Sequence, residues 1–212
     1  MSAPPISTEI IPILEDNYAY LVTYTPGYAF LVDPADPPLV LEFLQSLPTP
    51  PVITHILTTH KHWDHAGGNK KIVEALTPTQ PSNPISVVCG ALESHATTTL
   101  PCSDNDAIAL GPHSVTCMHT PAHTNGHMCY YVGTAEPPVV FTGDCMFKGG
   151  CGKFFEVREG GRAASCGRGE TVGGEVEGRG GWSRVVGDDA EVGGEALVAK
   201  VREAKDKGLH NK

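Results

Sequence analysis

Residues 58–68 read TTHKHWDHAGG, and this stretch decides how the rest of the sequence is interpreted. It places four potential metal ligands within six residues: His60, His62, Asp64 and His65. The largely apolar segment 52–59, VITHILTT, precedes them and predicts a buried strand. His60 and His62 are two residues apart, so in an extended segment both imidazoles point to the same side. The alternative is a polar loop that is rich in His by chance, and the density of ligand-type side chains disfavours it.

Asp64 and His65 fall where the chain turns toward the next helix, and the Gly67-Gly68 pair permits a tight passage there. This spacing suits two adjacent metal ions, one held by the first His pair and the other by Asp64 and His65. Two further candidates follow predicted strands: His123 in TPAHTNGH (120–127) and Asp144 in VVFTGD (139–144). Loops at strand ends can bring such side chains together, and a bridging carboxylate holds two cations about 3.5–4 Å apart.

Short β-branched or aromatic runs alternate with turn signals along the first part of the chain. They predict strands at 6–14, 17–24, 28–34, 52–59, 85–90, 107–110, 114–120, 127–133 and 139–144. Helical spacing of apolar residues predicts helices at 39–47 and 69–76. The pattern indicates an α/β (α+β) protein of layered, sheet-rich architecture rather than a doubly wound parallel sheet.

The composition of the 212 residues changes abruptly near residue 157. Residues 1–156 hold all 18 Pro and no Arg, whereas residues 157–212 hold no Pro, all six Arg and 13 of the 24 Gly. We therefore predict one domain over 1–156, which holds the candidate metal ligands, and an unrelated, mostly disordered tail over 157–212, with a short helix at 195–207. Gly, Arg, Glu, Val and Ala dominate the tail and can all be encoded by G-rich codons, so we interpret it as a translated intron or a shifted reading frame, with a linker or an RNA-binding tail as the alternatives.

Charge and cysteine usage restrict the protein class. The formal net charge of −9 argues against a nucleic-acid partner, and no apolar run reaches the length of a membrane span. The start of the chain has neither a secretory signal nor a mitochondrial presequence, and the seven Cys include no CxxC pair. These features predict a cytoplasmic protein with reduced thiols and no membrane contact, and we expect a monomer.

The order of the motifs resembles the metallo-β-lactamase superfamily, and more closely its hydroxyacylglutathione hydrolase (glyoxalase II) family. The resemblance rests on DNYAYLV (16–22), VDPADP (32–37), TTHKHWDHAGGN (58–69), TPAHTNGH (120–127) and FTGDCMFKGGCGKFFE (141–156). It covers residues 6–156 and implies an αββα sandwich, incomplete at its C-terminal side, with a binuclear metal site at one edge.

The resemblance also implies how the ligands are divided between two divalent ions, zinc first, with iron or manganese as alternatives. One ion would be held by His60, His62 and His123, and the second by Asp64 and His65, with Asp144 bridging them. Lys153 and Phe155 map onto family residues that contact glutathione, and some members carry Tyr where Phe155 stands. His127 is expected to support His123 as a neighbour of the ligands.

The activity implied is hydrolysis of S-(2-hydroxyacyl)glutathione thioesters, such as S-D-lactoylglutathione, in methylglyoxal detoxification. Metal-bound hydroxide would attack the thioester carbonyl, so no side-chain nucleophile is needed, and Cys145 and Cys151 are expected to be structural.

The resemblance ends at Glu156, before a GHEY-like motif whose His completes the second metal site in the family, and His210 lacks the neighbours to replace it. We therefore expect a weakened second site and weak or absent activity in this form. The competing functions are a mononuclear-iron persulfide dioxygenase and a catalytically inactive metal-binding remnant.

Overall fold

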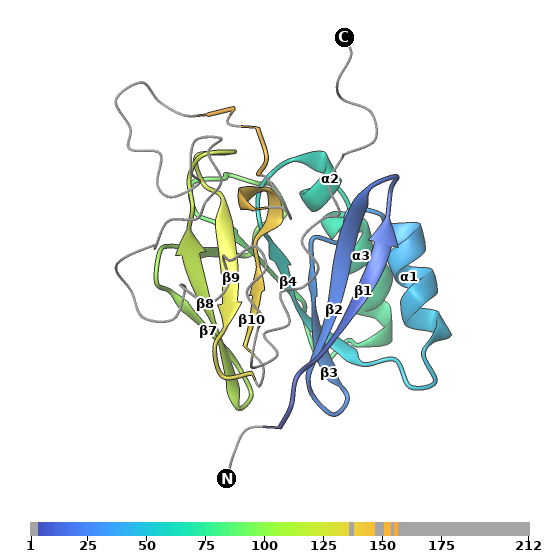
Figure 1. Cartoon of the computed structure of the whole chain (residues 1–212). Helices are drawn as coiled ribbons and strands as arrows, with labels where there is room; N and C mark the ends of the chain where they lie inside the picture. The colour runs from blue at the N-terminus through green and yellow to red at the C-terminus, as the bar shows by residue number, and fades with distance from the viewer. Residues whose placement is uncertain (1–3, 136–137, 147–150, 154, 157–212) are drawn as a thin grey trace, which may run out of the picture.

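The structure, a computed structural model, describes residues 4–135, 138–146, 151–153 and 155–156. Two sheets form the centre of this part of the chain, with helices packed against one of them (Figure 1). The expected helix at 195–207, His210 and the whole predicted tail lie outside the described residues. None of the helices in the described part combines the length and the apolar character that crossing a bilayer requires.

The first sheet has six strands in the order β1-β2-β3-β4-β5-β6. Their bounds are β1 Ser7–Ile13, β2 Asn17–Thr25, β3 Tyr28–Val32, β4 Val52–Thr58, β5 Ser86–Gly90 and β6 Leu100–Cys102. Strands β1, β2 and β3 pair antiparallel, and β3, β4, β5 and β6 pair parallel. The parallel pairs from β3 to β5 follow from the helical connections between these strands, which return the chain to the same end of the sheet.

The second sheet has four antiparallel strands in the order β10-β9-β8-β7. Their bounds are β7 Ala107–Leu110, β8 His113–His119, β9 Met128–Val132 and β10 Val139–Phe141. Alternate residues of β8 are more deeply buried, as expected for a strand with one face against a core. Short connections between consecutive strands make this sheet a simple meander.

Two α-helices cover the outer face of the first sheet, α1 (Pro37–Ser46) and α3 (Asn69–Leu76) (Figure 1). Helix α1 begins two residues before the predicted start because Asp36 caps it and proline is well tolerated in a first helical turn. A single-turn helix, α2 (Trp63–Ala66), lies between β4 and α3, and 3₁₀ turns occupy Thr77–Thr79 and Gly143–Cys145.

Apolar side chains form two main cores, one on each face of the first sheet. The core between the sheets joins Phe30 and Leu57 to Tyr130 and Phe141 of the second sheet. The other core lies between the first sheet and the helices, and includes Leu31, Val40, Leu44, Ile53 and Ile72. The layers of the described residues are therefore helix, sheet, sheet, which confirms the predicted mixed α/β class. The second helical layer of an αββα sandwich is not among the described elements.

Three local predictions need correction. Strand β4 ends at Thr58, so His60 and His62 lie in the loop after the strand and not in a continuation of the strand. Helix α2 occupies positions that the sequence assigned to a turn, and the three-residue strand β6 was not predicted at all. A strand of that length carries too few residues for a periodic signal, and its central Pro101 argues against a strand.

Candidate metal centre

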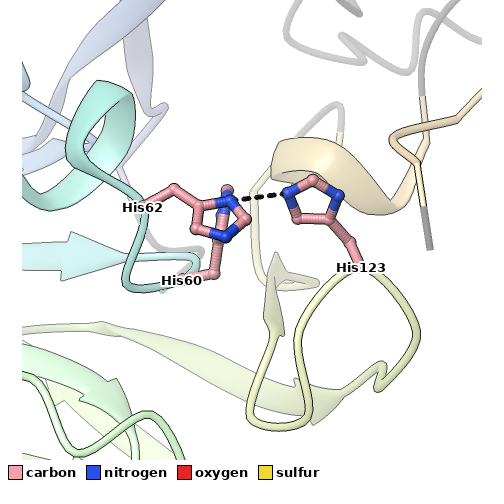
Figure 2. A group of neighbouring side chains, drawn as sticks. All are labelled: His60, His62 and His123. Atoms are coloured by element: carbon pink, nitrogen blue, oxygen red, sulfur yellow. Dashed lines mark hydrogen bonds between the residues drawn. The ribbon is translucent and has the colours of Figure 1, made fainter. Parts of the chain in front are cut away.

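Three histidines from two loops bring their ring nitrogens together. His60 and His62 follow β4, and His123 lies in the loop between β8 and β9 (Figure 2). The Nδ1 atom of His62 lies 3.0 Å from Nε2 of His60 and 2.8 Å from Nε2 of His123. The sequence therefore predicted the right side chains to meet, although the strand does not deliver the first two as expected.

The protonation states of these imidazole rings favour the binding of a cation over hydrogen bonds from ring to ring. The Nδ1 atom of His123 lies 2.7 Å from the carbonyl oxygen of Lys153, which can only accept, so Nδ1 carries the proton and Nε2 presents a lone pair. Burial lowers the pKa of His60 well below its ordinary value and also lowers the pKa of His123. Both rings are thus neutral, which is the form that binds metals.

A second group of potential ligands lies beside the first. The Nε2 atom of His65 lies 3.0 Å from Oδ1 of Asp144 and 3.6 Å from Oδ2 of Asp64. That nitrogen is buried but makes no hydrogen bond in the described residues, so the approach to Asp144 lacks hydrogen-bond geometry. The other Asp144 oxygen lies 3.3 Å from Nε2 of His123, and this carboxylate therefore faces both groups.

Among the described residues, two sets could each hold a metal ion. They are His60 with His62 and His123, and His60 with His65 and Asp144. Asp64 belongs to neither set, and its side chain is a quarter exposed at the margin of the second one. The histidine and carboxylate donors of these sets match what zinc and similar divalent ions prefer.

Asp33 orients His65, a role that no local spacing in the sequence predicts. Its carboxylate accepts hydrogen bonds from the backbone N–H of Thr59 at 2.8 Å and from the Thr59 hydroxyl at 2.7 Å. It also lies 2.8 Å from Nδ1 of His65, which leaves Nε2 directed at Asp144. Burial alone would lower the pKa of His65, but the Asp33 and Asp144 carboxylates outweigh it and raise the pKa to about 10. The pocket around this ring thus favours positive charge, either as a proton or as a cation.

Close backbone approaches explain two glycines near these ligands. A Cβ atom at Gly68 would lie 1.8 Å from the carbonyl oxygen of Pro34, so only glycine lets α3 start there. Gly143 has a φ of +48°, and a Cβ atom there would lie 2.5 Å from the Thr59 hydroxyl oxygen. Glycine at position 143 therefore lets the turn that carries Asp144 pack against Thr59, the residue whose hydroxyl donates to Asp33.

Comparison with protein families agrees with this geometry. Residues 13–86 match the family model described as the metallo-beta-lactamase superfamily, a range that contains the 58–68 stretch. Over these residues the chain is similar to the metallo-β-lactamase superfamily. The described part of the chain holds the His/Asp groups of the motifs that carry the resemblance, together with the sheet pair that the resemblance implies.

Two relatives found by sequence comparison are named hydroxyacylglutathione hydrolases. The chain is 43% identical over 150 residues to the cytoplasmic hydroxyacylglutathione hydrolase of Arabidopsis thaliana, covering 69% of this chain and 55% of the relative. It is 37% identical over 143 residues to the cytoplasmic hydroxyacylglutathione hydrolase isozyme of Saccharomyces cerevisiae, covering 66% of this chain and 52% of the relative. The chain thus spans about half the length of the curated relatives that it matches.

Solved structures of the superfamily share the fold. The BLEG-1 B3 metallo-beta-lactamase superposes with a TM-score of 0.57 at 22% identity, covering 69% of this chain and 76% of that one. ETHE1 from Myxococcus xanthus superposes with a TM-score of 0.51 at 27% identity, covering 65% of this chain and 56% of that one.

Lys153 and Phe155 lie beside His62 and His123. The Phe155 ring centroid is 5.6 Å from that of His62 and 5.2 Å from that of His123, and the side chain is 58% exposed. The Lys153 ammonium lies 5.4 Å from the centre of the Phe155 ring. Both side chains are exposed next to the candidate metal ligands, so a bound molecule could reach them.

His127 lies near His123, as expected, with 6.5 Å between the ring centroids, and it lies closer still to His60. Its Nδ1 atom lies 2.9 Å from the Thr120 hydroxyl, and its ring stacks on His60 at 5.1 Å between centroids. Burial lowers the pKa of His127 to about 4. The residue therefore supports His60 by packing, while the Lys153 carbonyl orients His123.

Proposed function

We propose that this chain hydrolyses S-(2-hydroxyacyl)glutathione thioesters such as S-D-lactoylglutathione in a metal-dependent reaction, giving D-lactate and glutathione. The observation that carries the proposal is the convergence of His60, His62 and His123 beside a second group centred on His65 and Asp144. The names of the sequence relatives support the thioester substrate. The proposed setting is cytoplasmic, as the names of both relatives suggest, with a monomeric chain and no nucleic-acid partner.

The proposed ligand assignment is the one that the family resemblance implies, and it adds Asp64, whose Oδ2 atom lies 3.6 Å from Nε2 of His65, to the second position. The first ion is assigned to His60, His62 and His123, and the second to Asp64 and His65, with Asp144 between them. Zinc is the proposed metal at both positions, since neutral imidazoles and carboxylates suit it. In this assignment the first ion has three ligands besides Asp144 and the second has two, so the second ion is proposed to bind more weakly.

The metal pair would lower the pKa of water from about 15.7 to near 7 and polarise the thioester carbonyl. The Asp144 oxygens face both groups and so keep the two positions close together. Asp64 stands at the partly exposed margin, where its Oδ2 atom can accept a proton. Lys153 and Phe155 are proposed to bind the glutathione part, the ammonium through its carboxylates and the ring by packing.

The proposed domain division follows the composition change and the matched region. Residues 1–156 are proposed to be the metallohydrolase domain, and residues 157–212 a tail that contributes no ligand or substrate contact.

The full chain, purified and supplied with zinc, tests the proposal by two measurements. These are the metal content by mass spectrometry and the cleavage of S-D-lactoylglutathione followed by thioester absorbance. We expect up to two zinc ions per chain, turnover, and a loss of at least about 100-fold on His62→Ala. His95→Ala, whose ring lies near Thr97 and in neither ligand set, is the matched control.

Two results would contradict the proposal. Iron at one ion per chain with oxygen consumption on glutathione persulfide would indicate the mononuclear-iron dioxygenase. Stoichiometric zinc without cleavage would indicate an inactive metal-binding remnant.

A further inference from the structure

Glu93 is a buried carboxylate that follows β5, and it binds donors from two different loops. Glu93 is only 3% exposed. The Oε2 atom accepts from the backbone N–H of Lys61 at 2.9 Å, and Oε1 accepts from the backbone N–H of Gly126 at 3.0 Å. The Thr124 hydroxyl also donates to Oε1. Burying a carboxylate is costly unless donors satisfy it, and here three donors do so.

The two loops that Glu93 joins are the loops that carry the three histidines. Lys61 stands between His60 and His62, and Thr124 directly follows His123. The carboxylate therefore spans the His60–His62 segment and the His123 segment without touching the ring nitrogens that face each other.

The surroundings of Glu93 leave it little room to move. A Cβ atom at Gly126 would lie 2.5 Å from the Glu93 backbone nitrogen, and a Cβ atom at Gly90 would lie 2.1 Å from the Gly126 carbonyl oxygen. The end of β5 and the loop after His123 are thus in direct backbone contact. A carboxylate fixed in this way can hold both loops at a constant separation.

We infer that Glu93 is a positioning residue that holds the two histidine loops at metal-binding distance, so that the triad is assembled before the ion arrives. The inference rests on the proposed function, because it takes His60, His62 and His123 as metal ligands. Glu156 joins the same loops from outside, with Oε1 at 2.6 Å from the Lys61 ammonium and Oε2 accepting from the Asn125 N–H at 2.8 Å. The Glu156 side chain is 27% exposed, so this outer tie is weaker.

The chemistry of the three donors requires a carboxylate at this position. In Glu93→Gln one oxygen becomes an NH₂ group, which cannot accept from an N–H. If the NH₂ group stands at Oε2 it faces the Lys61 N–H, and if it stands at Oε1 it faces the Gly126 N–H. One of the two loops is released in either orientation, although the size of the side chain is unchanged.

The test measures zinc affinity of the full chain by competition with a chromophoric chelator, together with urea unfolding of the metal-free protein. We expect Glu93→Gln to weaken binding of the tightest zinc by about 10- to 100-fold, as for other residues that orient metal ligands. Thr124→Val removes one of the three donors and should weaken binding by a smaller factor. Glu156→Gln should change affinity at most about fivefold. Glu74→Gln, an exposed change on α3, should leave affinity unchanged.

Unchanged zinc affinity in Glu93→Gln with a lower unfolding free energy would show a merely structural role and would overturn the inference. If Glu93→Gln does not fold, Thr124→Val decides, and wild-type affinity in that variant overturns it. A wild-type chain that binds no zinc would instead refute the proposed function, before any variant is compared.

Discussion

Two buried carboxylates, Asp33 and Glu93, organise the candidate ligands without belonging to either ligand set. Asp33 binds Thr59 and His65, which stand 26 and 32 positions later in the chain. Glu93 binds Lys61 and Gly126, 32 and 33 positions away. No local spacing rule connects residues so far apart, so the sequence could locate the dense His/Asp motif but not the side chains that orient it.

Asp33→Asn should weaken both the fold and the second metal position. If the new NH₂ group stands at Oδ2, it cannot accept from Nδ1 of His65, and if it stands at Oδ1, it cannot accept from the Thr59 backbone N–H. Either the orientation of His65 or the anchoring of Thr59 beside it is therefore lost. We expect the free energy of unfolding to fall by about 1.5–3 kcal/mol and zinc affinity at the second position to fall about 10- to 100-fold. Urea unfolding and chelator competition measure the two effects.

Asp36→Asn is the matched control for that change. Asp36 caps α1 by accepting from the backbone N–H of Leu39, and Asn serves equally well as a helix cap. If both variants behaved alike, Asp33 would have no special part in orienting His65.

Among the turns, the one after β10 allows a specific prediction about stability, because its Gly143 is tightly packed. Gly27 and Gly143 both have positive φ, at +81° and +48°, but only Gly143 is crowded. Gly27→Ala should cost about 1–2 kcal/mol from backbone strain alone. Gly143→Ala should cost about 1–3 kcal/mol more, because the Cβ atom would lie 2.5 Å from the Thr59 hydroxyl oxygen and displace it from Asp33. Urea unfolding of both variants checks the difference, and equal losses would mean that the turn yields freely.

A hydrogen bond between the two sheets leads to a second prediction about the free energy of unfolding. The hydroxyl of Tyr130 on β9 donates to the carbonyl oxygen of Thr58 at the end of β4, at 2.7 Å. Tyr130→Phe should lower the free energy of unfolding by about 1–3 kcal/mol, because the buried carbonyl oxygen loses its side-chain donor. Tyr28→Phe, at a 41% exposed position on β3, is the control and should change stability by at most about 0.5 kcal/mol. A Tyr130→Phe chain as stable as the control would contradict the expected contribution of this hydrogen bond to stability.

The elements themselves were mostly predictable from sequence, for identifiable reasons. Strands such as β2 and β9 carry β-branched and aromatic runs bounded by turn residues, and these signals are local. Strand β6 forms only because Leu100 and Cys102 pair with β5, which is a tertiary effect. The bend at His60 is likewise set by contacts, since Asp33 binds the Thr59 backbone just after β4 and ends the extended run.

At the scale of the whole molecule, the proposed ligands come from both sheets. His60, His62 and His65 follow β4 of the first sheet, whereas His123 and Asp144 follow β8 and β10 of the second. An ion held by the triad would therefore connect the two sheets at one edge, beside the Tyr130 hydrogen bond. The predicted sandwich explains how residues more than 80 positions apart reach one site, which a motif search alone cannot show.

Removing the metal should therefore lower the stability of the whole domain as well as its activity. Zinc at a thousand times its Kd stabilises a folded protein by about 4 kcal/mol, because it binds the native state and not the unfolded chain. For a chain of this size that corresponds to a fall in Tm of roughly 8–16 °C on chelation. Differential scanning calorimetry of the zinc-loaded and chelated full chain measures the shift, and readdition of zinc should reverse it. His60→Ala, which removes the residue shared by both sets, should show almost no zinc-dependent shift, whereas His95→Ala should keep it. A zinc-dependent shift of normal size in His60→Ala would place the stabilising ion elsewhere in the chain.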